Sequence, residues 1–148
     1  MNASSLPTDE FAALDATAQA ALVRTGKVSA LELVDAAIAR IEHGNSTLNA
    51  VIHQRFEQAR AEAKGALPDG IFRGVPFLLK DLDGFSAGDP YHAGNRALAE
   101  ASYVAPADSH LTHKFRQAGL IILGRTNTPE FGLMPTTEPL AKGPTRNP

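Results

Sequence analysis

The first 66 positions of the chain carry apolar residues at helical spacing. Thr8 can cap a first helix, with acidic residues in its first turn, and Gly26 can end it. Four apolar positions of this helix recur with the period of one helix face: Phe11, Leu14, Ala18 and Leu22. An amphipathic helix is therefore predicted from about residue 9 to residue 25.

A second helix is predicted directly after the first. Ser29-Ala30-Leu31-Glu32 has the Ser-x-x-Glu form of a capping box, and Gly44 is expected to end the helix. Its apolar stripe consists of Leu31, Val34, Ile38 and Ile41. These two helices are followed by a short predicted strand at 49–52 and a charged, alanine-rich helix from about His53 to Lys64 that stops at Gly65.

The segment from Val75 to Leu79 is a continuous apolar run of strand length after a loop at 65–74. Such a run is consistent with a strand buried on both faces. Pro76 fits only near the beginning of the strand or on an unpaired edge, because proline has no N–H to donate.

The next predicted elements are a helix and a second buried strand. An irregular stretch at 83–106 holds one short helical piece around 96–101 and precedes the helix, which Asp108 or Ser109 can cap. Leu111, Phe115 and Ala118 are expected to face inward, Gly119 ends the helix, and the strand covers 120–124.

The order strand, helix, strand predicts an α/β fold with a mixed, largely parallel sheet flanked by helices. Residues 125–148 show no apolar periodicity and cannot form a core of their own. Because an open parallel sheet needs more strands than these, we interpret the chain as an N-terminal part of a longer domain. Within 1–148, residues 1–66 form a helical region and 67–148 begin an α/β core.

Composition narrows the function classes. A hydrophobic share of 43% and a charged share of 20% are typical of a globular protein. The net charge is −2, and basic and acidic residues are interspersed along the chain. The sequence therefore shows no basic surface of the kind that binds nucleic acid or an anionic membrane. Without cysteine there is no disulfide, thiolate metal site or cysteine nucleophile. No secretory signal or membrane-spanning run is visible, which predicts a cytoplasmic protein.

Lys80 is the candidate catalytic residue because the apolar strand ends on it. Burial disfavours the ammonium form of lysine, so a lysine at the inner end of a buried strand can act as a neutral base. The alternative is that Lys80 lays its methylenes on apolar surface and pairs with Asp81 or Asp83 in water. The strand by itself leaves both interpretations open.

Histidines and serines offer weaker candidates. His110 and His113 lie three apart on a predicted helix, but carboxylates at metal-binding spacing are missing from the pattern, and we predict no metal or other cofactor. Of the serines after Lys80, Ser109 is explained as a helix cap and Ser86 as a loop residue, and neither these two nor Ser102 sits in a glycine-rich nucleophile turn.

Three blocks of sequence in register resemble the amidase signature family. They are GVPFLLKDL at 74–82, AGLIILGRTNTPEFG at 118–132 and TTEPLAKGPTRNP at 136–148. With the two N-terminal helices, the resemblance covers nearly the whole chain. It implies the amidase signature fold, of which this chain would hold the N-terminal part.

The resemblance implies hydrolysis of a carboxylic amide by a Ser-cisSer-Lys triad. One serine attacks the carbonyl, a second serine bridges, and a neutral lysine, matched here by Lys80, takes the proton. Both family serines belong to a block that begins shortly after the Thr-Arg-Asn-Pro motif, so the chain alone is expected to be inactive. Asp81, Thr126 and Asn127 are expected to support Lys80 structurally.

The resemblance also indicates a branch and a pocket. The opening at 14–41 and the PFLLKDL form of the lysine block are similar to bacterial amidases. The sequence Thr128-Pro129-Glu130-Phe131 departs from the glutamyl-tRNA amidotransferase branch of the family. The A subunit of that amidotransferase stays an alternative. A homodimer is a further implication. The residues expected to line a substrate pocket for a small-molecule amide are Phe131, Gly132, Leu133, Met134, Thr136 and Thr137.

A second alternative comes from a different class of protein. The chain could fold as a non-catalytic α/β module, from a truncated or split gene, that works by pairing with another chain. The coding frame after Pro148 discriminates the two, since the hydrolase requires a glycine- and serine-rich block there.

Overall fold

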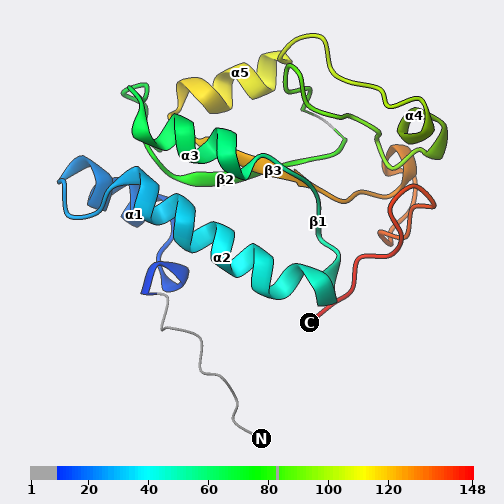
Figure 1. Ribbon diagram of the computed structural model, residues 1–148, viewed down its shortest axis with the longest axis horizontal. Coiled ribbons are helices and arrows are strands. Elements are labelled where there is room, and N and C mark those ends of the chain that lie inside the picture. Colours follow the sequence, from blue (N-terminus) through cyan, green and yellow to red (C-terminus); the bar gives the residue numbers. More distant parts are fainter. Residues whose placement is uncertain (1–9, 83) are drawn as a thin grey trace, which may run out of the picture.

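The computed structural model describes residues 10–82 and 84–148, and its elements are shown in Figure 1. Short 3₁₀ helices lie at η1, Glu10–Ala13, and η2, Glu130–Gly132. The helices and strands follow in the order α1 Ala16–Arg24, α2 Ala30–Leu48, β1 Val51–Gln54, α3 Phe56–Lys64, β2 Pro76–Lys80, α4 Arg96–Glu100, α5 His110–Gln117 and β3 Ile121–Thr126.

The strands of the described residues form one mixed sheet in the order β1-β3-β2. β2 runs parallel to β3, and the α5 crossover connects the two, as the strand-helix-strand order predicts. β1 pairs with the other side of β3 in the antiparallel sense. The chain therefore has an α/β fold built around a small mixed sheet.

Helices cover both faces of this sheet (Figure 1). α2 and α3 pack together against one face, and α5 lies against the other, where the rings of Phe77 and Phe115 are 4.9 Å apart. The buried core between α2, α3 and β3 consists of Ala30, Val34, Ala37, Ile38, Phe56, Ala59, Ile121 and Leu123. Burial of these side chains is the main force that holds the helices on the sheet.

β2 is an edge strand among the described residues, and this corrects the prediction that it is buried on both faces. Leu79 is buried, but Pro76, Phe77 and Leu78 are only half-buried. Pro76 is the first residue of β2, as its missing N–H requires. The fully buried strand is instead β3, in which Ile121 to Arg125 are all buried.

The capping box of α2 is confirmed, but the predicted end of this helix is wrong. The Ser29 hydroxyl accepts a hydrogen bond from the Glu32 N–H, and the Ser29 N–H donates to the Glu32 carboxylate. The helix continues through Gly44 to Leu48 and ends at Asn49, which adopts the left-handed conformation. Within the first turn of α2, Leu33 is buried although it was not part of the predicted apolar stripe, whereas Leu31 of that stripe is half-buried.

Other boundaries shift by a few residues. Thr8 lies outside the described residues, and α1 begins at Ala16 with the Asp15 side chain as its cap. Ser109 caps α5 as expected, but Leu111 is 44% exposed and Thr112 takes the inward position. The Thr112 hydroxyl can occupy that position because it forms a hydrogen bond with the Ser109 hydroxyl at 3.1 Å. No helix in the described ranges is long and apolar enough to cross a membrane.

Replacement of Gly44 and of Gly124 by alanine is expected to change the stability of the protein in opposite directions. Gly44 lies inside α2, and a Cβ there would touch only Leu48, at 3.7 Å, so Gly44→Ala should stabilise the protein by about 0.5–1 kcal/mol. Gly124 lies in β3, where a Cβ would be 2.0 Å from the His53 carbonyl oxygen, so Gly124→Ala should destabilise it by about 1–3 kcal/mol. Chemical denaturation measures both, and a stable Gly124→Ala variant would contradict the β1–β3 register.

Candidate active site

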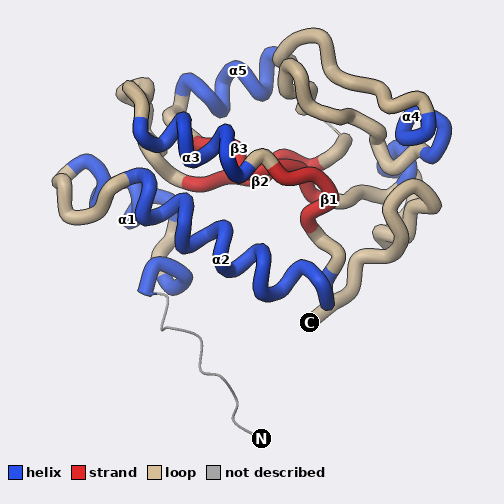
Figure 2. The backbone as a smooth tube through the Cα atoms, viewed as in Figure 1, coloured by secondary structure: helices blue, strands red, loops and turns tan. Residues whose placement is uncertain are grey.

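The carboxyl ends of β2 and β3 meet at one edge of the sheet. Lys80 is the last residue of β2 and pairs with Thr126, the last residue of β3. Figure 2 shows that mainly loops, with the short helix α4 among them, gather at this end of the sheet. In α/β folds ligands bind beyond the carboxyl ends of parallel strands, so this edge is where a site is expected. The Lys80 side chain is exposed there.

A buried ion pair joins the two strands directly behind Lys80. The Arg125 Nε donates to the Asp81 carboxylate at 3.0 Å, and the two side chains are only 1% and 2% exposed. Arg125 also donates through Nη2 to the Lys80 carbonyl oxygen at 3.3 Å. Asp81 thus supports Lys80 from within the sheet, because the carboxylate holds the guanidinium that contacts the Lys80 backbone.

Residues from the irregular loop after β2 complete this support. The Tyr91 ring lies under the Arg125 guanidinium, 5.2 Å from its centroid, and the Tyr91 hydroxyl donates to the Leu82 carbonyl. The backbone N–H of His92 donates to the Asp81 carboxylate at 3.2 Å. A loop that looked irregular in the sequence is therefore anchored on the ion pair.

A small polar cavity of about 60 Å³ lies beside the ion pair. It is lined by Ile52, His53, Asp81, Pro90, His92, Arg125 and Lys142. Within the described residues, Asp81 Oδ2, Arg125 Nη1 and His92 Nε2 are buried without a hydrogen-bond partner. A cavity of this volume has room for water, which needs roughly 15 Å³ and several polar partners.

Burial lowers the pKa of His92 below its ordinary value. The neighbouring Asp81 carboxylate acts in the opposite direction, and the cations Lys142 and Arg125 lower the pKa further. His92 is therefore held in its neutral form next to the ion pair.

Asn127 organises the C-terminal segment, and its side-chain hydrogen bonds within the described residues go to that segment and to its own neighbour Thr128. Its side chain donates to the Gly143 carbonyl and to the Thr145 hydroxyl, each at 3.0 Å. Its own N–H donates to the Ala50 carbonyl at 2.8 Å. These bonds bring residues 142–146 against the start of β1, on the same side of the molecule as the loops.

The residues predicted to line a substrate pocket lie beyond β3 on the surface. Phe131, Leu133 and Met134 are 50%, 79% and 62% exposed, and Gly132 packs on Leu82. A cavity of about 160 Å³ at this segment is lined by Pro129, Glu130, Met134, Thr136, Glu138, Pro139 and Leu140. Of the predicted residues, Met134 and Thr136 line this cavity. Thr137, the residue after Thr136, is half-buried.

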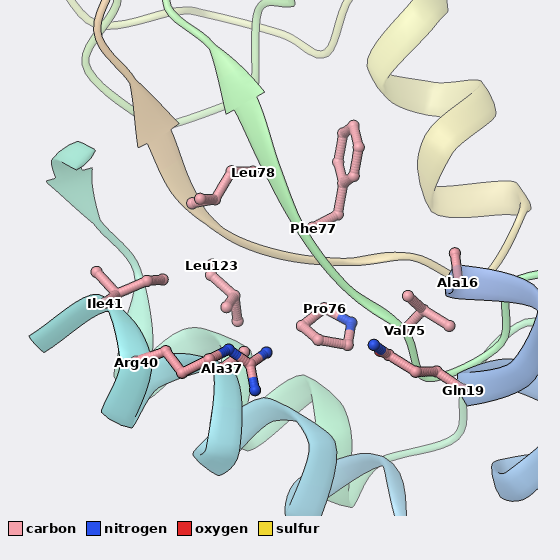
Figure 3. A pocket seen from close by; sticks show the side chains of 10 residues that line it. All are labelled: Ala16, Gln19, Ala37, Arg40, Ile41, Val75, Pro76, Phe77, Leu78 and Leu123. Carbon is pink, nitrogen blue, oxygen red and sulfur yellow. The ribbon is translucent and has the colours of Figure 1, made fainter. Parts of the chain in front are cut away.

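A larger cavity, of about 480 Å³, lies elsewhere, between α1, α2 and the edge strand β2 (Figure 3). Its lining is mostly apolar, with Arg40 as its charged group. Burial lowers the pKa of the Arg40 guanidinium below its ordinary value. The lining contains no nucleophile, acid or base suited to hydrolysis.

The serines and histidines considered as candidates have structural surroundings. Ser86 is buried and accepts a hydrogen bond from Arg116 at 3.0 Å, and Ser109 caps α5. His110 and His113 are exposed on α5, and no group of three or more metal-ligating side chains occurs in the described residues. The sequence reasoning missed the Asp81–Arg125 pair, for which the signal was a charged residue directly after each of the two apolar runs, at 75–79 and 120–124.

Comparison with known proteins gives concordant matches. The Amidase family profile matches residues 32–148. The chain is 48% identical over 134 residues to 6-aminohexanoate-cyclic-dimer hydrolase of Paenarthrobacter ureafaciens, a match that covers 90% of this chain and 27% of that protein. It is 41% identical over 142 residues to the putative amidase AmiC of Mycobacterium bovis, over 95% of this chain and 29% of that protein.

Solved structures match the fold as well. The structure of 6-aminohexanoate cyclic dimer hydrolase complexed with substrate superposes with a TM-score of 0.85 at 48% identity, over 90% of this chain and 27% of that one. Peptide amidase from Stenotrophomonas maltophilia gives a TM-score of 0.80 at 29% identity, over 94% and 31%. The chain thus spans about 27% of the length of the hydrolase that it resembles.

The lowered pKa of His92 predicts a pH dependence of stability. Because the folded state disfavours protonation of His92, the unfolded state binds the proton first as the pH falls below about 6.5, and stability is lost there. The slope from this group is at most about 1.4 kcal/mol per pH unit. Between pH 7.5 and pH 5.5 the free energy of unfolding should decrease more in the wild type than in His92→Gln. Equal pH dependence in both proteins would contradict a neutral His92.

Proposed function

The chain belongs to the amidase family, and from that premise we propose that Lys80 is the general base of an amide hydrolase. The resemblance carried by the three sequence blocks is confirmed, and its bacterial branch agrees with the 48% identity to a cyclic-dimer hydrolase.

The observation that supports the proposal best is the position of Lys80. Its side chain leaves the sheet at the joint carboxyl end of β2 and β3, where the loops gather, and its backbone is held by the buried Asp81–Arg125 pair. A solvated strand end would need no such support. A base must be held in one place relative to the group that it deprotonates, which is what the support provides.

The proposed reaction has two stages. A serine hydroxyl adds to the amide carbonyl while its proton passes through a second serine to the neutral amine of Lys80. The C–N bond then breaks, and the amine leaves with that proton, which forms an ester between serine and acyl group. Water, deprotonated by the same route, cleaves the ester to the acid and restores the serine. We place both serines outside residues 1–148.

The exposure of Lys80 indicates what those other residues must also do. A base accepts a proton only through a free electron pair, so the proposed role requires the neutral amine of Lys80. Lys80 is exposed among the described residues. In this proposal the segment that carries the serines covers Lys80, so that desolvation favours the neutral amine when the site is complete.

We propose a small-molecule carboxylic amide, linear or cyclic, as the substrate. The segment from Phe131 to Thr137 supplies exposed apolar groups, together with Leu140, which suits the acyl part of such a molecule. The catalytic chain of a glutamyl-tRNA amidotransferase is the second candidate, supported by 41% identity to that protein of Mycobacteroides abscessus, over 90% of this chain and 28% of that one. The Thr128-Pro129-Glu130-Phe131 sequence favours the plain hydrolase over it.

Lys80→Ala should abolish amide hydrolysis in the natural polypeptide that carries these residues. Loss of the base removes the proton acceptor, and we expect kcat/KM to fall by at least about a thousandfold. Lys64→Ala is the matched control, since Lys64 is exposed at the end of α3, and its activity should stay within about twofold. Circular dichroism checks that both variants fold. Substantial activity in Lys80→Ala would refute the assignment.

The 148-residue chain alone should not react with a serine-directed fluorophosphonate. Ser86 is fully buried and Ser109 is occupied as a helix cap, so neither is an activated nucleophile. Mass spectrometry of the treated chain measures the labelling. Stoichiometric modification would reveal a nucleophile within these residues and overturn the placement of the serines.

A further inference from the structure

We propose that Arg125 is a positioning residue for Lys80, acting through the peptide group that links Lys80 to Asp81. The inference rests on the proposed function of Lys80 and assigns to Arg125 a role in the reaction beyond that of an ordinary structural ion pair. Arg125 does not reach the reacting atoms in this account. Its effect on catalysis passes entirely through the backbone and side-chain direction of Lys80.

The peptide group between Lys80 and Asp81 is fixed on both of its sides. Its carbonyl oxygen accepts from Arg125 Nη2 at 3.3 Å, and its N–H donates to the Thr126 carbonyl oxygen at 3.0 Å. The plane of this peptide defines the ψ angle of Lys80. Since ψ and the strand register together set the direction of the Cα–Cβ bond, these two hydrogen bonds aim the lysine side chain.

The guanidinium itself is held from three directions. The Asp81 carboxylate accepts from its Nε at 3.0 Å, the Lys80 carbonyl accepts from its Nη2, and the Tyr91 ring lies 5.2 Å below it. The Arg125 side chain is only 1% exposed, so water does not compete for these contacts. A planar guanidinium can donate to a carboxylate and a carbonyl at once, whereas a lysine ammonium presents one point charge.

The chain offers a matched control in Arg55. Its Nε donates to the Asp89 carboxylate at 2.9 Å, and its Nη1 donates to the Ile122 carbonyl at 2.9 Å. The side chains of this pair are 9% and 10% exposed, so it is also a buried pair that holds a strand carbonyl. It differs from the Arg125 pair in that Ile122 lies near the start of β3, away from Lys80.

The test compares steady-state kinetics of variants in the natural polypeptide that carries these residues. Arg125→Met should lower kcat at least tenfold and leave KM within twofold, because the base is misdirected while substrate binding is unchanged. Arg125→Lys should give a kcat between those of Arg125→Met and the wild type. Arg55→Met removes a pair that anchors the loop after β2 and holds the Ile122 carbonyl, but does not hold the Lys80 backbone. It should lower the melting temperature to a similar extent, and it should lower kcat less than Arg125→Met does at a temperature where both are folded.

The outcomes separate the two proposals. If Lys80→Ala is inactive but the Arg125 variants keep wild-type kcat when folded, the positioning role is refuted and the function of Lys80 stands. If Lys80→Ala stays active, the proposed function fails. Should Arg125→Met not fold, Arg125→Lys decides alone, with a kcat reduction of at least threefold at unchanged KM expected, and an unchanged kcat overturning the role.

Discussion

The buried ion pair between Asp81 and Arg125 is the constraint on which the candidate site depends. Taking both charges out of water is costly, and a buried pair is tolerated only when further hydrogen bonds satisfy its atoms. Here the Lys80 carbonyl, the His92 N–H and the Tyr91 ring supply further contacts. Among the described residues, Asp81 Oδ2 and Arg125 Nη1 have no hydrogen-bond partner, and both side chains line a cavity with room for water. The pair therefore gathers, at the ends of two parallel strands, groups that are far apart in the sequence.

The rest of the fold places these strand ends. α2 and α3 bury one face of the sheet and α5 the other, which leaves the carboxyl ends of β2 and β3 to the loops. A second network fastens the loop after β2 to the helices, because Arg55 pairs with Asp89 and Arg116 with Asp108. Burial is the largest influence on the Asp89 carboxyl and raises its pKa. Hydrogen bonds from His53 and Ser86 and the charges of Arg55 and His53 together outweigh burial, so the pKa lies below its ordinary value.

Local signals in the sequence predict the elements well where one interaction decides the outcome. The capping box at Ser29 and Glu32 is satisfied by two reciprocal hydrogen bonds, so its four residues suffice to place the start of α2. Gly44 failed as a stop because a single glycine costs a helix only about 1 kcal/mol, and α2 ends instead at Asn49, which adopts the left-handed conformation. Thr112, not Leu111, faces inward because a neighbouring serine satisfies its hydroxyl.

The candidate site was predicted only in part, for a physical reason. Lys80 is visible as a charge that ends an apolar strand, and its location at the sheet edge follows from the parallel order of β2 and β3. Its partners are not visible in the same way, since Arg125 and His92 reach Asp81 from 44 and 11 residues away. Of the two interpretations that the strand left open, the exposed Lys80 side chain matches the solvated strand end, and a neutral base would require that further residues cover it.

The most direct measurement of the central claim is a double-mutant cycle on unfolding free energy, with Asp81→Asn, Arg125→Met and the double variant. Each single change should cost about 3–5 kcal/mol, because it leaves one buried charge without its counterpart. The double variant should then cost less than the sum of the two by at least about 2 kcal/mol. Costs that simply add would mean that the two residues act independently, and that the ion pair does not organise the strand ends.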